Sequence, residues 1–391
     1  ATFKSKKVIS KNKRKILILI KKKIDFSRYK PIIRLINKSK KLDYALLVSG
    51  IHLLRSHGLT IKEIFKENFK VYKKVNMFDE KSKDSPARMV KGLGEVLLKL
   101  PAIINGYKPN IILSGFDIGA NFALTIAGAH MNIPVFHIQG GEVTGSIDES
   151  LRHAMSKFSH IHLVANSDAK NRLIRMGESP KTIYNVGCPS LDALRLENDH
   201  SKDYILKKFG IKLSEKYLLL IQHPVTTEEK NSSKQIKETL IALKKINLPT
   251  LIILPNNDAG YKKIVEEVKG SKFKWTKTLS LKEYKTLLSK CSVLIGNSSS
   301  GIHEASTFKI PVINIGTRQQ GRLKPKNVIT TDYKADQILK SIKFCLNSKI
   351  FAKKIKLIKN PYGNGFSAKE IIRILENIDL RKIKIQKINN Y

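Results

Sequence analysis

The stretch Asn110–Ile138, NIILSGFDIGANFALTIAGAHMNIPVFHI, contains the pattern that decides the fold. Its segment Asn110–Ser114 predicts a β-strand, the Ala- and Gly-rich segment Asn121–Met131 predicts a helix, and Pro134–Ile138 predicts a second strand. Two strands joined through a helix are the unit from which parallel sheets with helices on both faces are built. The stretch therefore predicts an α/β fold.

The same alternation extends in both directions and restarts once along the chain. Further strands are expected at 15–20, 44–49, 182–186, 217–221, 250–254, 293–295 and 312–315, and helices at 30–37, 85–100, 167–175, 233–245, 259–268, 281–289 and 301–307. The turn residues Gly187–Ser190 and a charged stretch to about His200 separate the two series. We therefore expect two Rossmann-like domains with parallel sheets, residues 1–190 and 191–365, with a basic arm at residues 1–14.

The charge of the chain invites a nucleic-acid interpretation, which the rest of the composition does not favour. The 391 residues include 73 Lys and Arg against 32 Asp and Glu, a net charge of +41. Such a charge is typical of proteins that bind nucleic acid or anionic membranes. The lysines run from end to end of the chain, however, and the aromatic residues that basic nucleic-acid grooves interleave make up only 7%. A lysine-rich surface is favoured, and no nucleic-acid partner is expected.

Membrane, secreted and metal-binding classes are also disfavoured. No apolar run approaches the roughly 20 residues that a membrane span requires, and no signal-like apolar segment follows the basic N-terminal residues. Cys188, Cys291 and Cys345 lie far apart without a CxxC pair, and the histidines show no metal-ligand spacing. These features favour a cytoplasmic protein without a bound metal.

Polar and small residues follow the strand that ends at Ile138. The segment Gln139–His153 reads QGGEVTGSIDESLRH, and its glycines allow a ligand to approach the backbone. Asp148 and Arg152 are four residues apart and fall on one face of the helix expected there. The two could form an ordinary helix ion pair, but their position beside a Gly-Gly turn at a strand end indicates a site.

The strand ends of the second domain indicate an anion site. Gly296–Glu304, GNSSSGIHE, places serines and a glycine between a strand and a helix, so that hydroxyls, backbone N–H groups and the helix dipole all favour an anion. Ordinary capping would need only one serine. His223 ends a neighbouring strand, and Arg318 and Arg322 can neutralise a diphosphate. No Walker motif or complete GxGxxG occurs, so a standard dinucleotide or P-loop site is not supported.

Taken together, the order of these loops resembles that of the hydrolysing UDP-N-acetylglucosamine 2-epimerases. The resemblance extends from about residue 14 to 345, and its most specific blocks are His137–His153 (HIQGGEVTGSIDESLRH), Gln222–Thr226 (QHPVT), Pro255–Gly260 (PNNDAG), Gly296–Ala305 (GNSSSGIHEA) and Val312–Arg322 (VINIGTRQQGR). It implies two Rossmann-like domains facing a central cleft in a GT-B-like fold, with the C-terminal helix, residues 366–391, packed back on the first domain. It also implies a UDP-linked amino sugar as substrate, no metal or redox cofactor, and a homo-oligomer, either a dimer or a tetramer.

The resemblance further implies a reaction and the residues that perform it. A base removes the C2 proton of the sugar while UDP leaves, and water then adds with inversion at C2, as in the first step of nonulosonic acid biosynthesis. The implied catalytic residues are Asp117, Asp148, Arg152, Gln139, Glu142, Arg28 and His223. The implied UDP-binding residues are Lys23, Ser27, His223, Asn256, Ser298, Ser299, Glu304 and Arg318.

The sequence departs from the family pattern at several of these positions. Lys21–Lys23 replace a Gly-Thr-Arg, and Ile118 replaces the arginine of a Gly-Asp-Arg loop. Gln139 stands where some relatives have an acid or a histidine, and because an amide cannot act as a general base, Glu142 would substitute for it. These differences predict a shifted substrate, such as a 2,4-diacetamido-trideoxy sugar nucleotide, or weaker activity. A GT-B glycosyltransferase and a silent nucleotide-sugar binder remain as alternatives.

Overall fold

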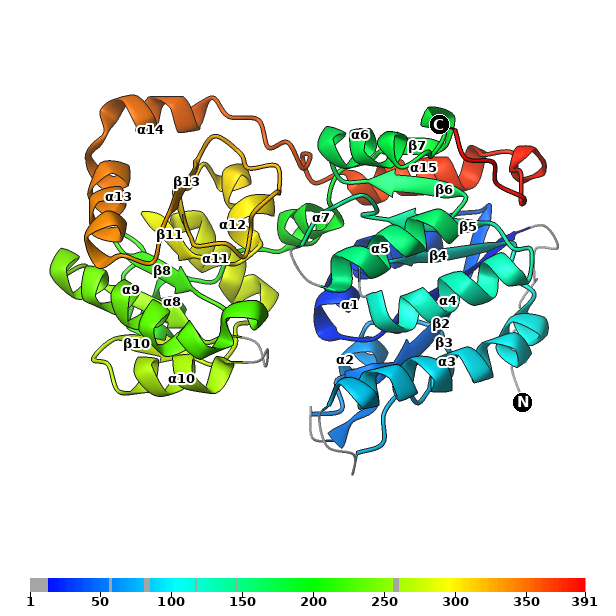
Figure 1. Cartoon of the computed structure of the whole chain (residues 1–391), viewed down its shortest axis with the longest axis horizontal. Helices are drawn as coiled ribbons and strands as arrows, with labels where there is room; N and C mark the ends of the chain where they lie inside the picture. The colour runs from blue at the N-terminus through cyan, green and yellow to red at the C-terminus, as the bar shows by residue number, and fades with distance from the viewer. Residues whose placement is uncertain are drawn as a thin grey trace, which may run out of the picture. The chain divides into compact units, whose positions relative to one another are not determined.

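A computed structural model describes residues 13–55, 58–80, 85–116, 118–144, 147–255 and 260–390 (Figure 1). The chain forms two compact units. The first comprises the chain up to Gly141, Leu151–Pro189 and the chain from Ser367, and the second comprises Glu142–Ser150 and Ser190–Phe366. The short segment Glu142–Ser150 lies within the predicted first domain but groups with the second unit.

Within the described residues, the first unit contains a seven-stranded parallel sheet in the order β3-β2-β1-β4-β5-β6-β7. Its strands are β1 (Arg14–Ile20), β2 (Leu42–Ser49), β3 (Val71–Val75), β4 (Ile111–Gly115), β5 (Val135–Ile138), β6 (Ile161–Val164) and β7 (Ile183–Asn185). The central strands are runs of Ile, Leu and Val because a parallel sheet is buried on both faces. The strand order reverses between β1 and β4, and ligands of such sheets bind outside the carboxyl ends of the strands at this point.

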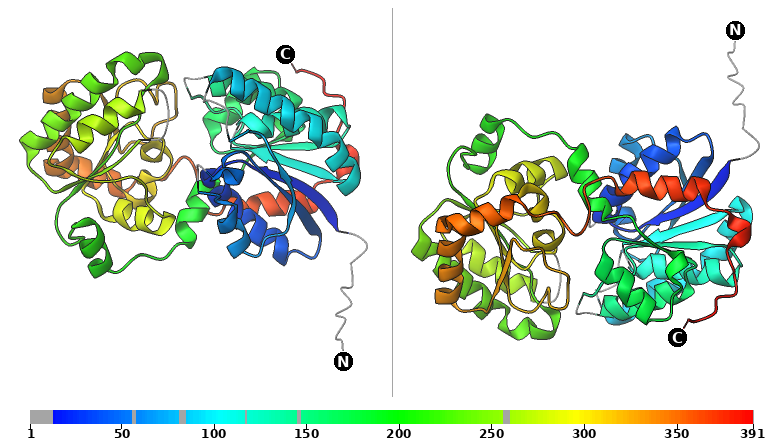
Figure 2. Two further views of the ribbon diagram at one scale, coloured as in Figure 1. Left: turned by 90° about the horizontal axis from the view of Figure 1, so that it is seen from below. Right: turned by 90° about the horizontal axis from the view of Figure 1, so that it is seen from above.

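Helices cover both faces of the first sheet (Figure 2). They are α1 (Lys23–Lys38), α2 (Ile61–Lys66), α3 (Pro86–Tyr107), α4 (Ile118–His130), α5 (Ile147–Phe158), α6 (Ser167–Arg175) and α15 (Ser367–Asn377), with 3-10 turns η1 (Gly50–Leu53), η3 (Pro180–Thr182) and η6 (Leu380–Lys382). Helix α5 begins in the second unit, and its part from Leu151 groups with the first. Ile16 and Ile18 of β1 pack in the core that α1 and α15 cover, whereas Leu17 and Leu19 pack in the core that α3 and α4 cover. The C-terminal helix α15 thus packs on the first unit, as the resemblance implies.

The second unit repeats this plan with a six-stranded parallel sheet among its described residues, in the order β10-β9-β8-β11-β12-β13. Its strands are β8 (Leu218–Ile221), β9 (Thr250–Ile253), β10 (Lys274–Thr276), β11 (Val293–Gly296), β12 (Val312–Ile315) and β13 (Val328–Thr331). Its helices are α7 (Pro189–Leu196), α8 (Lys202–Phe209), α9 (Ser232–Ile246), α10 (Tyr261–Lys269), α11 (Leu281–Lys290), α12 (Ser300–His303), α13 (Ala335–Asn347) and α14 (Lys349–Lys356), with 3-10 turns η4 (Thr226–Asn231) and η5 (Ala305–Phe308). The order reverses between β8 and β11, the strands that precede His223 and Asn297.

The predicted fold class, two parallel α/β sheets, is confirmed, and two local expectations were wrong. The helix expected to stop before Pro101 continues through it to Tyr107, because Ile104 and its neighbours bury against the sheet and offset the lost hydrogen bond. The helix expected at 301–307 is a single turn, α12, followed by η5. The helix dipole at the serine loop is therefore weaker than a full helix would supply.

Candidate functional site

Three strands end in unusual backbone conformations, and two of them, β4 and β11, border a reversal of the strand order. Phe116, just after β4, and Gln139, just after β5, have φ angles of 63° and 58°. Residues other than glycine rarely adopt positive φ angles, and the residues that do so cluster at functional sites. Gly296, the last residue of β11, has φ 123°, and a Cβ there would lie 2.0 Å from the carbonyl oxygen of Ile221. Only glycine allows β8 and β11 to approach each other so closely.

The loop after β1 is held differently from what the family pattern suggests. Lys21, at the position of the usual glycine, is only 8% exposed, and its stem lies against Gly50. Gly50 has φ 58°, and a Cβ on it would lie 2.2 Å from Cγ of Lys21. The large side chain at position 21 is thus accommodated by a glycine opposite it. At the start of α1, Asp25 is buried, and its carboxylate accepts a hydrogen bond from the backbone N–H of Lys22 at 3.3 Å.

Arg28, Phe116 and Gln139 form what we call the arginine–glutamine cluster of the first unit. The Arg28 guanidinium lies over the Phe116 ring, 5.5 Å from its centroid, and Nη1 donates to Oε1 of Gln139 at 3.5 Å. Gln139 also donates to Sγ of Cys188 at 3.2 Å. Within the described part of the chain, the buried Nε of Arg28 has no hydrogen-bond partner. Ser27 directly precedes Arg28 in α1, and its side chain is half-buried.

Helix α5 carries the acidic residues that follow the Gly-Gly turn. Asp148 and Arg152 occupy neighbouring turns of this helix, and Asp148 is exposed whereas Arg152 is half-buried. Glu149 accepts a hydrogen bond from the N–H of Thr144 at 2.9 Å, which ties the loop to the helix. A hydrogen bond from α6 also holds the Gly-Gly turn, because Arg172 donates to the carbonyl of Gly141 at 2.6 Å.

Glu142 is brought to the serine loop within the second unit. Its carboxylate lies 3.6 Å from Nε2 of His303, and both side chains are almost fully buried. The His303 ring in turn contacts the ring of Tyr362, with centroids 4.5 Å apart. Arg322 donates from Nε to the carbonyl of Val143 at 2.8 Å. The sequence motifs contain His303 and Arg322, but only the fold shows that both meet the segment after Gly141.

His223, Asn297, Ser298, Arg318 and Gln319 form the serine-loop cluster of the second unit. Asn297 accepts from the N–H of His223 at 2.7 Å and donates to its carbonyl at 2.8 Å, which links the ends of β8 and β11. Arg318 and Gln319 donate to the carbonyl of Asn297 at 3.2 and 2.9 Å. Asn297 and Gln319 were not among the predicted site residues, although both lie inside the quoted motifs.

The electrostatics of this cluster favour a neutral histidine beside a cation. Burial, assisted by the charge of Arg318, lowers the pKa of His223 to about 3. His223 is therefore uncharged at neutral pH and acts there only as a hydrogen-bonding imidazole. The positive charge of the cluster comes from Arg318.

The serines pack around the single turn of α12. The Ser298 and Ser300 hydroxyls lie 2.8 Å apart, and the backbone carbonyl of Ser299 accepts from the N–H groups of Ile302 and His303. Glu304 is half-buried at the end of this turn. Burial and, to a smaller extent, the charge of Glu304 raise the pKa of Tyr284. Ser298, Ser299 and Glu304 are thus on one short loop, with part of its hydrogen-bonding capacity used internally.

Four of the positions singled out in the sequence lie, wholly or by their side chains, outside the described part of the chain. Asp117 and Asn256 are outside the described residues, and the side chains of Lys23 and Ile118 are not described. Among the described residues, no group of three or more His, Cys, Asp or Glu side chains could hold a metal ion. Over the same residues, no helix is long and apolar enough to cross a membrane.

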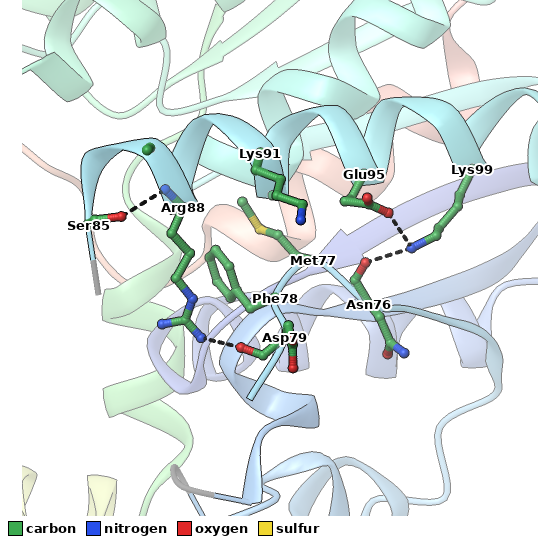
Figure 3. Close-up of a pocket in the computed structure, with 11 residues that line it drawn as sticks. Asn76, Met77, Phe78, Asp79, Ser85, Arg88, Lys91, Glu95 and Lys99 are labelled. Atoms are coloured by element: carbon green, nitrogen blue, oxygen red, sulfur yellow. Dashed lines mark hydrogen bonds and ion pairs between the residues drawn. The ribbon is translucent and has the colours of Figure 1, made fainter. Parts of the chain in front are cut away.

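A hollow of about 580 Å³ lies away from these residues, between the segment after β3 and helix α3 (Figure 3). Arg88 crosses one end of it, over the Phe78 ring and donating to the carbonyl of Asp79, and Lys99 bridges Glu95 and the carbonyl of Asn76. The lining contains none of the predicted site residues. Neighbouring groups hold Arg88 and Lys99, and we assign the hollow no role.

The chain was compared with models of known protein families and with known proteins. The model of the UDP-N-acetylglucosamine 2-epimerase family matches residues 34–376. The chain belongs to this family. The predicted family and the predicted enzyme class, a 2-epimerase of UDP-linked acetamido sugars, are therefore confirmed.

Curated relatives and solved structures of the 2-epimerase family cover nearly the whole chain. The UDP-N,N'-diacetylbacillosamine 2-epimerase (hydrolyzing) of Legionella pneumophila is 33% identical over 97% of this chain and 100% of its own length. The UDP-N-acetylglucosamine 2-epimerase of Neisseria meningitidis serogroup B is 32% identical over 84% of this chain and 86% of its own. The structure of a Neisseria meningitidis UDP-GlcNAc 2-epimerase bound to UDP-GlcNAc matches with a TM-score of 0.76 at 18% identity, covering 92% of this chain and 99% of that one.

Proposed function

We propose that this member of the family is a hydrolysing 2-epimerase that converts a UDP-linked 2-acetamido sugar into UDP and the free 2-epimeric sugar. The observation that carries the proposal lies within the second unit. A buried carboxylate, Glu142, lies 3.6 Å from His303 on the serine loop, and Arg322 holds the segment that follows Glu142. The reaction needs a proton acceptor and an anion-binding loop close to each other, and we propose Glu142 and the serine loop for these two roles.

The chemistry sets what these residues must do. A carboxylate accepts the C2 proton, the electron pair of the C–H bond forms a C1–C2 double bond, and the bond from C1 to the UDP oxygen breaks. Water then supplies a hydroxyl to C1, and a proton arrives at C2 on the face opposite to the first. Proposed proton-transfer groups are Glu142 and Asp148, together with Asp117 on sequence alone. Arg318 and the hydroxyls of Ser298 and Ser299 are proposed to stabilise the departing diphosphate.

The remaining roles follow the chemistry of each group. Arg28 is proposed to bind the substrate because its buried Nε has no partner among the described residues. Neutral His223 is proposed to hydrogen-bond the nucleotide, and Glu304 to accept from ribose hydroxyls. We assign Gln139 to orienting Arg28, since an amide cannot move a proton in this step. Lys23, Ser27 and Asn256 are proposed UDP contacts, and Arg152 a catalytic contact, from the sequence motifs alone.

We propose a 2,4-diacetamido-trideoxy sugar as the preferred substrate, for synthesis of a legionaminic-type acid. The Legionella pneumophila relative, named for UDP-N,N'-diacetylbacillosamine, supports this choice at 33% identity over 97% of the chain. The departure of Lys21–Lys23 from the family's usual Gly-Thr-Arg is the second reason for proposing a shifted substrate. The proposed location is the cytoplasm, in keeping with the buried thiols of Cys188, Cys291 and Cys345, which form no disulfide among the described residues.

A homo-oligomer is also proposed, with the outward face of α3 as its contact. Val90 and Leu98 are 72% and 79% exposed on this helix, although most of the surface is rich in lysine. Light scattering coupled to gel filtration tests this proposal. A dimer that Val90→Glu and Leu98→Glu together dissociate supports it, and a monomeric wild-type protein contradicts it.

The activity is tested by incubating the purified chain with UDP-N-acetylglucosamine and, separately, with UDP-N,N'-diacetylbacillosamine. We expect UDP and the free 2-epimeric sugar from at least one of them, with a higher kcat/KM for the diacetamido sugar. UDP release that requires an added acceptor would instead support a glycosyltransferase. Binding of both nucleotides without release would support a silent binder.

A further inference from the structure

The C-terminal segment after η6 reaches the far end of helix α5 in the first unit. Lys387 donates from Nζ to the carbonyls of Ser156 and Lys157, at 3.0 and 2.9 Å, in the last turn of α5. The last carbonyls of a helix have no partner within it, and a cation there also complements the helix dipole. Lys387 therefore acts as a C-terminal cap on the helix that carries Asp148 and Arg152.

A buried carboxylate fixes the position of this cap. Glu178 is 2% exposed and lies 2.6 Å from Nζ of Lys387, 3.0 Å from Nζ of Lys157 and 3.0 Å from Nε2 of His162. Burial alone would raise the pKa of Glu178, but the contacts with His162 and Lys387 lower it to about 2. It is thus an anion throughout the working pH range. The free-energy cost of removing these charges from water offsets much of their mutual attraction. The cluster therefore fixes the geometry of the segment more than it adds to the stability of the fold.

Further contacts hold the same segment along its length. The carbonyl of Ile385 accepts from Nε2 of His160 at 3.1 Å, because Nδ1 of that ring already accepts from the N–H of Val135 at 3.0 Å. Asn389 accepts from Nζ of Lys157 at 2.6 Å, and the N–H of Asn390 donates to the carbonyl of Gly177 at 2.9 Å. We call Ile385, Lys387, Asn389 and Asn390 the α5 strap.

The strapped end of α5 is connected to the Gly-Gly turn. Ser156 donates to the carbonyl of Arg152 at 3.2 Å and lies 3.1 Å from Nδ1 of His137 in β5. Gly140 packs directly on this pair, since a Cβ on it would lie 2.8 Å from His137 Nδ1 and 3.0 Å from Ser156 Oγ. The residue that Lys387 caps is therefore also the residue on which the turn between Gln139 and Glu142 rests.

We propose that Lys387 is a positioning residue for the reaction: through the α5 strap it fixes helix α5 and the Gly-Gly turn, and hence the proton-transfer groups Asp148 and Glu142. This inference rests on the proposed function. Asp148 lies eight residues before Ser156, about 12 Å along the helix, so a tilt at the capped end displaces Asp148 although the cap lies a distance away from it. A displacement of this kind lowers the rate of the chemical step more than it weakens binding.

The test compares Lys387→Met, which removes the charge and keeps most of the stem, with Lys387→Arg, which keeps the charge and donors. Lys384→Met is the matched control, because Lys384 is an exposed lysine of the same segment. The readouts are kcat and KM for UDP release, the Kd of UDP, thermal unfolding, and hydrogen exchange of the α5 amides.

Lys387→Met is expected to lower kcat about tenfold, to leave KM and the Kd of UDP within about twofold, and to speed exchange along α5. Lys387→Arg should recover most of kcat, and Lys384→Met should match the wild type. If Lys387→Met does not fold, Asn389→Ala should show a smaller change in the same direction.

The proposal is overturned if Lys387→Met changes only thermal unfolding while kcat and α5 exchange match Lys384→Met. A wild-type protein that releases no UDP from either sugar nucleotide would contradict the proposed function. The α5 strap is then judged by hydrogen exchange, where unchanged α5 protection in Lys387→Met overturns it.

Discussion

The serine-loop cluster of the second unit and the arginine–glutamine cluster of the first unit stand at equivalent places in two similar sheets, but they are held differently. Asn297 makes two short hydrogen bonds with the backbone of His223, and Arg318 and Gln319 are anchored on its carbonyl. In the first unit, Arg28 reaches Gln139 only at 3.5 Å and has a buried nitrogen without a partner in the described chain. The serine-loop cluster is thus held more tightly by its own contacts than the arginine–glutamine cluster, in which a donor of Arg28 has no partner among the described residues.

Loss of a proton-transfer group is expected to have the largest effect. Asp148→Asn and Glu142→Gln should each lower kcat by at least about a hundredfold, because an amide cannot accept the C2 proton. The Kd of UDP, measured by calorimetry, should stay within about threefold if the serine-loop cluster binds UDP by itself. Full turnover in both variants would show that neither group is a base.

Removing the cation of the serine-loop cluster is expected to weaken binding more than chemistry. Arg318→Ala should raise the Kd of UDP by about 10- to 100-fold, the cost of losing a charge-assisted hydrogen bond of about 1.5–3 kcal/mol. Calorimetric titration with UDP measures this change. Asn314→Ala, in the neighbouring strand β12, offers a comparison within the same unit, and equal losses in the two variants would argue against a specific role for Arg318.

The two clusters should also respond differently to pH. His223 has a pKa of about 3 through burial and the nearby Arg318, so UDP affinity should show no step from its titration between pH 5 and 8. In the first unit, burial lowers the pKa of three histidines, His137, His160 and His162. The ionisable groups that surround these histidines are Glu178, Lys157, Lys387, Arg152 and His153.

The sign of the stability change follows from those lowered values. As the pH falls below about 6.5, the unfolded chain takes up protons that the folded histidines do not, so folding stability falls with pH. Urea denaturation at pH 8 and pH 5 should therefore show the first unit losing stability at the lower pH. Equal stability at both values would contradict the buried, neutral state of these histidines.

A change within the arginine–glutamine cluster is expected to be smaller. Arg28→Lys should keep the charge but lose the planar contact with Phe116, and kcat/KM should fall only about threefold to tenfold. Steady-state kinetics with the preferred sugar nucleotide provides the measurement. A loss as large as that of Asp148→Asn would mean that the arginine–glutamine cluster is as sensitive to a lost contact as the proton-transfer groups.

The fold and the motif blocks could be predicted from the sequence because their signals are local. Alternating strand and helix segments identify the parallel sheets, and contiguous blocks such as GNSSSGIHEA identify the family. Asn297 and His303 were missed although they lie inside such blocks, since their partners, His223 and Glu142, are remote in sequence.

Contacts between distant segments could not be predicted from local patterns. The burial of Lys21 depends on a glycine at position 50, and the cap on α5 comes from Lys387, more than 200 residues away. In a chain with 73 Lys and Arg, neither lysine differs locally from the many solvated ones. The continuation of α3 through Pro101 likewise depends on tertiary burial that overrides the local preference of proline.

The central claim is that this chain removes the C2 proton of a UDP-linked 2-acetamido sugar and replaces it from solvent. Turnover in deuterated water, followed by NMR and mass spectrometry of the released sugar, tests it most directly. The account predicts free UDP and a 2-epimeric sugar that carries one deuterium at C2. Release of UDP with the original hydrogen retained at C2 would contradict it.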